Sequence, residues 1–484
     1  MTDNAWLLAG LGLYLVVVLA VGFVTWRRMR TLDDFVLGGR SLSPFAAALS
    51  ERASGESAWF LLGLPGAAYA LGFREFWSVI GIAFGVFASW TLLSRLLNHE
   101  ARRLGALTIP DFFEARFGDG TRALRVVSMV IILVFYTSYV GAQFVGAGKI
   151  LNATFGLDVA TGMWIGAAVV VLYTFMGGFL AVVWTDVVQG LLMMVVAVAL
   201  PLLGLAKLGG PAAFVDAVAA RGPEFLTMSG GQTGRAFVFG VMLGGVSWGL
   251  GYFGQPHLLT RYMAIRSAEE TRTGKTIAVS WVLLSYWGAA FIGLVGIGLL
   301  PGLEDPEQVM PLLAKTLLPA WFAGLAIAGA IAAMMSTADS QLLVATSALV
   351  EDIYAQLVNR NASPRRLVLL SRLATLGVAG VALALAFGNQ DLIFDWVAYA
   401  WAGLGSSFGP PLLLALRWRG ITRNGALAGM LAGMTSTLVW QNVEALGDFL
   451  DIKIATFAIS LLVTVVVSRL GRADSSSASS PPVR

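Results

Sequence analysis

Residues 41–66 read SLSPFAAALSERASGESAWFLLGLPG, and this stretch decides how the chain can fold. It is apolar enough to cross a membrane, yet it carries Glu51, Arg52 and Glu56 and is interrupted by Gly55. A charged side chain at the centre of a bilayer costs roughly 2.5–3.5 kcal/mol, so three charges within six residues are not expected to face lipid. We therefore predict a broken transmembrane helix that lines a binding site.

The composition is that of a membrane protein. Of the 484 residues, 57% are hydrophobic and only 12% are charged, about half the charged share of a soluble domain. The chain has no cysteine, which excludes disulfides and cysteine-ligated metals, and two histidines leave little for a histidine metal site. Its net charge of +4 comes from basic residues between apolar runs, as in cytoplasmic loops rather than in nucleic-acid-binding surfaces. We therefore expect an all-α polytopic membrane protein.

Apolar runs near 20 residues long recur along the chain, and helices are the economical way for them to cross lipid. We expect about thirteen spans, at 5–25, 43–71, 76–97, 123–151, 158–177, 182–207, 235–257, 274–300, 313–350, 367–387, 391–416, 424–442 and 453–469. Basic residues gather in alternate gaps, such as Arg102 and Arg103 after the third span and Arg261 and Arg266 after the seventh. The positive-inside rule places the N-terminus outside and the C-terminus, with a disordered tail at 472–484, in the cytoplasm.

A second interrupted run is GVMLGGVSWGLGYFGQPH, residues 240–257. Its start lies five spans after that of the first, which fits two inverted five-helix repeats of a secondary transporter, at 43–207 and 235–416. Helices 5–25 and 424–469 would be additions within a single transporter domain, residues 1–471. Glycines in membrane helices also permit close packing, so either run alone is ambiguous. The pair, beside buried charges, favours a transport site.

Polar side chains of three spans are expected at similar depth. Glu51 lies about nine residues into its span, roughly 13–14 Å at 1.5 Å per residue, and Asp186 lies at a similar depth in its own. In the ninth span Ser336, Asp339 and Ser340 share one helix face. Such oxygens suit a hard cation, although Ser and Thr hydroxyls commonly bond back to their own helix. The acids favour an ion path, because intramembrane acids usually mark one.

Eight blocks recur in order along nearly the whole chain: DDFVLGGRSLSPF (33–45), GLPGA (63–67), LTIPDFFEARF (107–117), GGFLAVVWTDVVQ (177–189), WGLGYFGQPHLLTRYM (248–263), MSTADSQLLV (335–344), YAWAGLGSSFGP (399–410) and TRNGALAGM (422–430). With them the chain resembles the sodium/solute symporter family, most closely its bacterial sodium/proline symporters. The resemblance implies the LeuT-type inverted-repeat fold of five plus five helices, the bacterial cytoplasmic (inner) membrane, and sodium-driven uptake of a small solute, foremost L-proline. No enzyme is expected, because His99 and His257 lie at cytoplasmic loops without a partner cluster.

The resemblance also implies the site residues. The principal sodium site would use the carbonyls of Ala53, Glu56 and Ala333 with the hydroxyls of Ser336 and Thr337. A second sodium site, known in some members, would use Asp186, Ser336, Asp339 and Ser340. The solute would lie against Ser57, Ala58, Trp59, Tyr139, Trp248, Tyr252 and Pro256. For the aromatic residues, ordinary helix packing is the alternative.

The chain departs from the proline symporters within its opening stretch. Gly55 stands where they carry an aspartate important for sodium coupling, and Glu56 stands where the residue is usually apolar. We hypothesise that Glu56 or Asp339 compensates for the lost carboxylate. The alternatives are a symporter for another amino acid or small carboxylate, which could be proton-coupled, and a transporter-like solute sensor. Solute accumulation that collapses with the ion gradient is expected of a symporter only.

Overall fold

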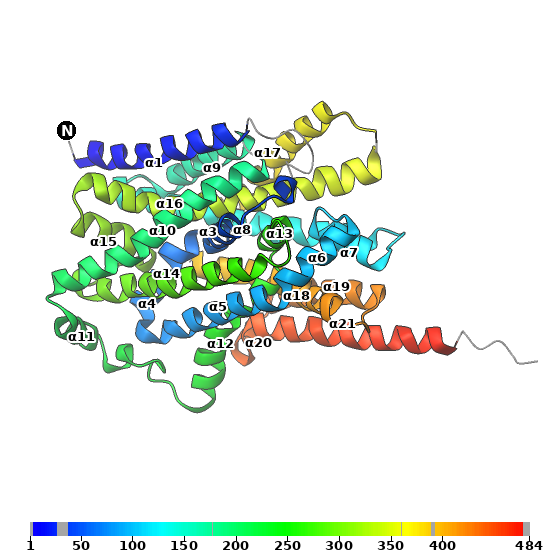
Figure 1. Cartoon of the computed structure of the whole chain (residues 1–484). Coiled ribbons are helices and arrows are strands. Elements are labelled where there is room, and N and C mark those ends of the chain that lie inside the picture. Colours follow the sequence, from blue (N-terminus) through cyan, green and yellow to red (C-terminus); the bar gives the residue numbers. More distant parts are fainter. Residues whose placement is uncertain (1–2, 27–36, 177, 360, 389–392, 478–484) are drawn as a thin grey trace, which may run out of the picture.

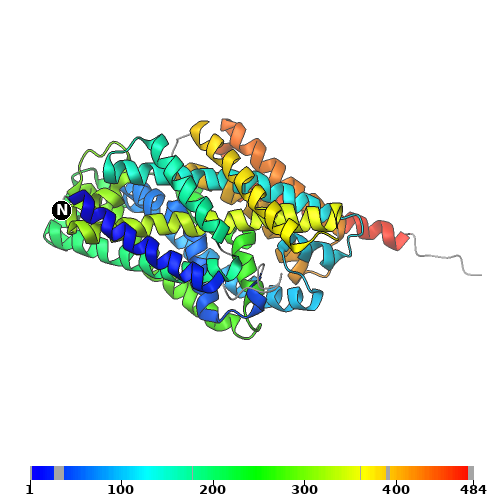
Figure 2. The same cartoon turned by 90° about the horizontal axis from the view of Figure 1, so that it is seen from above.

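The structure is a computed structural model that describes residues 3–26, 37–176, 178–359, 361–388 and 393–477. These residues form helices whose long members lie side by side along one approximate direction (Figure 1, Figure 2). In chain order the α-helices are α1 (Asp3–Trp26), α3 (Pro44–Ala58), α4 (Leu64–Leu71), α5 (Phe76–Ser89), α6 (Arg95–Leu104), α7 (Ile109–Phe117), α8 (Ala123–Phe155), α9 (Val159–Met176), α10 (Phe179–Leu208), α11 (Pro211–Ala219), α12 (Leu243–Val246), α13 (Pro256–Ala264), α14 (Thr271–Leu299), α15 (Val309–Leu317), α16 (Ala320–Ser347), α17 (Pro364–Gly388), α18 (Ile393–Arg417), α19 (Arg423–Asn442), α20 (Glu444–Phe449) and α21 (Ile452–Ser477). The predicted all-α class is confirmed.

Nine helices within the described ranges are long and apolar enough to cross a membrane. One is the 61-residue stretch Pro44–Leu104, which contains two of the predicted spans. Between these two, α4 ends at Gly72, whose φ of 69° is a conformation that favours glycine. The shorter apolar helix Val159–Phe175 lies on the predicted span 158–177, of which Gly177 is outside the described residues.

Two predicted boundaries differ from the structure. The expected span 313–350 is divided, because α15 ends at Leu317 and α16 begins only at Ala320. Pro319 accounts for the division: it disfavours helical geometry in the preceding Leu318, which has φ −114° and ψ 146°. At the other end of the chain α21 continues to Ser477, so the first residues of the expected tail are helical, and 478–484 lie outside the described residues.

Helix α3 lies at the centre of the bundle. Every residue from Ala46 to Ala58 is buried, and the helix packs against α10, α13, α14 and α16. Ser57, at φ 57° and ψ −178°, interrupts the helical geometry, and the chain continues through a π-helical turn, Trp59–Gly63, into α4. The predicted break within 41–66 is therefore confirmed.

The second predicted interruption is also present. A 3-10 helix, Ser247–Phe253, ends at Gly254 (φ −130°, ψ 17°) and Gln255 (φ −89°, ψ 102°), after which Pro256 begins α13. Since α3 and α13 pack against each other, two interrupted segments from distant parts of the chain meet inside the protein.

Glycines bring the second interrupted segment close to α5. A Cβ atom on Gly85 would lie 2.3 Å from the Cα of Gly249, and a Cβ on Gly249 would lie 2.3 Å from the carbonyl oxygen of Gly81. Backbone atoms cannot yield as a flexible side chain can, so these glycines are required for packing as well as for the interruption.

We expect Gly85→Ala to lower the unfolding midpoint of the purified protein in detergent. Overpacking costs about 1–3 kcal/mol, which exceeds the ~1 kcal/mol that alanine gains over glycine in a helix. Gly380→Ala on α17 is the matched control, since its Cβ would meet nothing within 4 Å. Equal midpoints for the two variants would contradict the packing argument.

Candidate functional site

Three of the predicted sodium ligands meet at the break in α3. The hydroxyl oxygen of Ser336, on α16, lies 2.9 Å from the carbonyl oxygen of Ala53 and 3.1 Å from that of Ala333. All three residues are fully buried. The structure therefore brings together a small group of uncharged oxygens of the kind that a hard monovalent cation prefers.

The other two predicted ligands are placed beside this group. Thr337 Oγ1 donates to the carbonyl of Ser54 at 2.9 Å, one residue away from the expected partner Ala53. The carbonyl oxygen of Glu56 accepts a hydrogen bond from the backbone N–H of Trp59, within the turn that follows the break. Its part in a cation site stays a prediction.

At the break, side-chain oxygens accept hydrogen bonds from three consecutive backbone amides. Ser57 N donates to Thr337 Oγ1 (2.9 Å), Ala58 N to Gln143 Oε1 (2.8 Å) and Trp59 N to Ser57 Oγ (3.1 Å). These bonds offset the positive φ of Ser57, a geometry that costs a non-glycine residue on the order of 1–3 kcal/mol. Gln143 was missed by the sequence analysis; the available signal was a lone amide in the apolar run 123–151, one helical turn after Tyr139.

Aromatic rings form a cage next to these amides. The ring centroid of Trp59 lies 4.7 Å from that of Trp248 and 5.7 Å from that of Phe394, and Trp248 and Phe394 are 5.2 Å apart. Tyr286 lies 6.2 Å from Trp59, and its hydroxyl is 3.2 Å from that of Tyr252. The structure thus joins predicted Trp59, Trp248 and Tyr252, and it adds two rings that sequence reasoning missed. We name Trp59, Trp248, Tyr252, Tyr286 and Phe394 the aromatic cage.

The remaining predicted solute contacts have structural roles around the cage. Tyr139 is buried on α8, and its carbonyl accepts from the side chain of Gln143 at 3.3 Å. Pro256 is the first residue of α13 and is buried. The indole Nε1 of Trp59 is buried without a hydrogen-bond partner among the residues that the structure describes, so it is a donor still free for a ligand.

The charges of the opening stretch form one buried network on the wall of the cage. Arg52 pairs with both Glu51 and Glu56, the latter at 3.4 Å, and its guanidinium lies 5.0 Å from the ring centroid of Tyr252. Glu56 also accepts a hydrogen bond from the hydroxyl of Tyr286. The three charged residues have no exposed surface. Because α3 stays regular up to Glu56, Arg52 and Glu56 lie four residues apart on one helix face and form an i,i+4 pair.

Gly55, where the resemblance leads us to expect an aspartate, lies next to this network. A Cβ atom at position 55 would lie 3.6 Å from Arg52 Nη2, so an acid there would reach the same guanidinium. In this chain Glu56 reaches it instead. The hypothesis that Glu56 compensates for Gly55 stays a prediction, and Asp339 lies with the group described next.

Asp186 gathers the second group of predicted residues. Its Oδ2 accepts from Ser50 Oγ (2.7 Å) and Ser54 Oγ (2.8 Å), and Ser54 Oγ is 2.9 Å from Ser340 Oγ. Asp339 is fully buried, and neither of its carboxylate oxygens has a hydrogen-bond partner in the described part of the chain. Of the four residues predicted for a second sodium site, Asp186 and Ser340 are joined, while Ser336 belongs to the group at Ala53.

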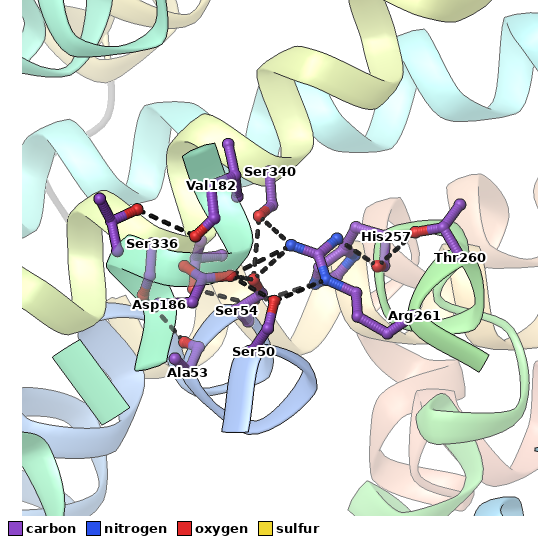
Figure 3. A network of polar contacts seen from close by, with 12 residues as sticks. Ser50, Ala53, Ser54, Val182, Asp186, His257, Thr260, Arg261, Ser336 and Ser340 are labelled. Atoms are coloured by element: carbon purple, nitrogen blue, oxygen red, sulfur yellow. Dashed lines mark hydrogen bonds and ion pairs between the residues drawn. The ribbon is translucent and has the colours of Figure 1, made fainter. Parts of the chain in front are cut away.

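Two residues assigned to cytoplasmic loops are inside the protein. Arg261 is 1% exposed and reaches from α13 into the group around Asp186, as Figure 3 shows. His257 is fully buried; its ring contacts the hydroxyl of Tyr136 (2.8 Å) and the carbonyl of Ser54 (3.1 Å). The prediction was wrong because residues 256–264 form helix α13, which is buried along its whole length, whereas a count of basic residues treats everything after an apolar run as loop.

A cavity of about 880 Å³ lies outside the aromatic cage, with Phe394 in its lining. Glu307 stands behind Phe394: it accepts from the backbone N–H of Phe394 at 3.1 Å and pairs with Lys149 Nζ at 2.5 Å. Burial raises the pKa of Glu307 above its ordinary value, with Lys149 acting in the opposite direction. Because Phe394 is a member of the aromatic cage and also lines the cavity, it lies between the two.

Comparison with known proteins assigns the family. The model described as "Sodium:solute symporter family" matches residues 35–433. A Bacillus subtilis protein named high-affinity proline transporter PutP is 42% identical over 463 residues, 95% of this chain and 97% of its own, and the Escherichia coli sodium/proline symporter is 40% identical over 471 residues, 96% and 92%. The solved structure of a Na⁺-coupled sialic acid symporter superposes with a TM-score of 0.80 at 22% identity, covering 97% of this chain and 98% of its own. The chain belongs to the sodium:solute symporter family.

Proposed function

We propose that the protein is a secondary active symporter that couples inward sodium flux to the uptake of a small solute, foremost L-proline, by alternating access. The observation that carries the proposal is similarity at 42% and 40% identity, along nearly the whole chain, to proteins named for proline transport. The two groups of residues at the break in α3 supply a place for each of the two transported species.

The sodium ion would bind where Ser336 meets Ala53 and Ala333. The present hydrogen bonds from Ser336 to the two carbonyls mark three oxygens that can turn toward a common point. Binding an ion there requires only that the hydroxyl point its lone pair, rather than its proton, at the centre. Thr337 and the carbonyl of Glu56 would complete the coordination.

The solute would bind in the aromatic cage beside the broken helix. A carboxylate is suited to the amides of residues 57–59, which lie at the start of a helical segment and are now held by side-chain acceptors that a ligand could replace. The free Nε1 of Trp59 offers a further donor. The rings suit the apolar body of an amino acid such as proline.

For the membrane arrangement we propose thirteen crossings, with the N-terminus outside and the C-terminus in the cytoplasm of a bacterial inner membrane. The repeats would be 43–207 and 235–416, and the meeting of the two interrupted segments supports this pairing. Large apolar side chains exposed on α1, among them Trp6, Leu8 and Val16, are suited to contact with lipid.

Alternating access has support at the two ends of α8. Near its C-terminal end, Lys149 lines the open cavity outside Phe394. Near its N-terminal end, Arg125 is 6% exposed and pairs with Asp111 (2.5 Å), Glu114 and Asp352. With α8, which carries Arg125, these ion pairs join three different elements. A cavity thus opens at one end of α8, whereas at the other end a buried arginine pairs with three acidic residues, as expected of a conformation that faces outward.

Proton coupling is the second candidate, because Glu56 is a buried carboxylate that takes the place of an aspartate used in sodium coupling. The test is proline uptake into proteoliposomes with sodium, lithium and proton gradients imposed separately. We expect accumulation with the sodium gradient, which collapses with a sodium ionophore. Accumulation driven by the proton gradient alone would identify protons, rather than sodium, as the coupling ion. Accumulation of other small carboxylates but not of proline would identify a different solute.

We expect Ser336→Ala to raise the sodium concentration for half-maximal uptake by about tenfold or more, since loss of one ligand worth ~1.4 kcal/mol changes an affinity tenfold. Ser347→Ala, on the same helix and also buried, is the control and should leave sodium dependence unchanged. Sodium dependence that is the same in both variants would remove Ser336 from the cation site.

We expect Glu56→Gln to reduce sodium-driven uptake at least about tenfold, because it neutralises a partner of Arg52 while keeping an acceptor for Tyr286. The double variant Gly55→Asp/Glu56→Met should restore uptake: it moves the acid to position 55, where a Cβ has only ordinary contacts at 3.4 Å or more. Glu100→Gln, at a partly exposed pair with Arg103, is the control. Full uptake by Glu56→Gln would refute the compensation.

A further inference from the structure

Arg261 holds an unusual place for a basic residue in a membrane protein. Its guanidinium donates to Ser50 Oγ (3.1 Å), Ser54 Oγ (2.8 Å), Asp186 Oδ2 (3.2 Å), Ser340 Oγ (2.7 Å) and the carbonyl of His257 (2.6 Å). These acceptors come from α3, α10, α16 and α13 itself (Figure 3). A buried arginine with five such contacts is fully paired, so it is built into the site.

The oxygens around Arg261 are those that a sodium ion would need. Nη2 alone has three of them within 3.2 Å, namely Ser54 Oγ, Asp186 Oδ2 and Ser340 Oγ. Asp186 and Ser340 belong to the second sodium site expected from the sequence. A guanidinium nitrogen and a metal ion cannot share this volume, and their like charges repel at such short range.

Arg261 is part of the chain, so it cannot leave as a transported ion does. Hydrogen bonds to other segments also hold the end of α13 near Arg261. Leu42 N donates to the carbonyl of Ala264 (3.1 Å), and Arg266 N donates to that of Leu42 (3.1 Å). The side-chain amide of Asn98, on α6, donates to the carbonyls of Tyr262 (2.8 Å) and Ile265 (2.9 Å). The positive charge at Asp186 is therefore tethered.

We infer that Arg261 is the resident cation of the second site and that it thereby limits transport to one sodium ion per solute. The inference rests on the proposed function as a sodium symporter. Arg261 satisfies Asp186 in every cycle without crossing the membrane, so that of the two sodium sites expected from the sequence the Ser336 group is left for a transported ion. Asp339 is the competing possibility, because its unpartnered carboxylate could bind a second sodium ion of its own.

The test is the flux ratio in proteoliposomes, measured as initial uptake of radioactive sodium and radioactive proline in the same sample. We expect a ratio of about one for the natural chain and for Arg261→Lys, which keeps a tethered cation, and about two for Arg261→Gln, which frees Asp186 and its hydroxyls for an ion. Arg266→Gln is the control, since Arg266 is exposed and pairs with Glu270 at the surface. A purely structural role for Arg261 would change rates or protein yield but not this ratio.

A ratio of two in the natural chain would overturn the inference and point to Asp339. A ratio of one in Arg261→Gln with uptake retained would also overturn it. Should Arg261→Gln fail to fold, the test uses the electrostatically balanced variant Asp186→Asn/Arg261→Gln and measures sodium binding in detergent. The number of sodium ions bound by this variant should equal that of the natural chain, about one per chain. A lower number would overturn the inference. Sodium binding without any sodium-driven uptake would instead count against the proposed function alone.

Discussion

The rest of the structure depends on the break in α3, because a helix that opens inside a membrane protein must have its freed backbone groups satisfied by its neighbours. Ser57 lies at positive φ. Around it, backbone groups either lose their regular helical hydrogen bonds or form further hydrogen bonds; these groups are the amides of residues 57–59 and the carbonyls of Ala53 and Ser54. Thr337 and Ser336 on α16 and Gln143 on α8 form hydrogen bonds with these groups. The break therefore joins α3 to α16 and α8 through hydrogen bonds, and these are the groups that we propose for binding a cation and a carboxylate.

Buried charge imposes the second constraint, and the chain meets it in two separate networks. On the side of the aromatic cage, Arg52 lies between Glu51 and Glu56 with tyrosine hydroxyls around them. On the side of α10 and α16, Arg261 lies against Asp186 and three serines. Each network places one arginine where an unpaired acid would be costly in a low-dielectric interior. The first network lies on the wall of the aromatic cage, where we propose that the solute binds, and the second lies where the sequence led us to expect a second sodium ion.

The chain belongs to the sodium:solute symporter family, and its resemblance to proline symporters leads us to expect an aspartate where this chain has Gly55. An aspartate at position 55 is absent, yet the guanidinium that it would meet is supplied with a carboxylate by Glu56 one position later. Glu56 thus places an acid within reach of the guanidinium that an acid at position 55 would meet. The backbone carbonyls in the cation site that we propose would be insensitive to such a change, because they do not depend on side chains.

The sequence by itself determined the all-helical class and both interrupted segments, because apolar length and glycine content are local properties of the chain. The meeting of Ala53, Ala333 and Ser336 was implied by the resemblance that the recurring blocks carry. That resemblance also indicated the rings of Trp59, Trp248 and Tyr252. Only the tertiary structure decided that Gln143, Tyr286 and Phe394 complete the site and that Arg261 and His257 lie inside it. The physical reason is that these side chains act through partners on distant helices. A lone polar or aromatic residue in an apolar run has no local pattern that distinguishes a packed side chain from a ligand. An arginine just beyond an interrupted run counts as loop until the packing shows that its helix is buried.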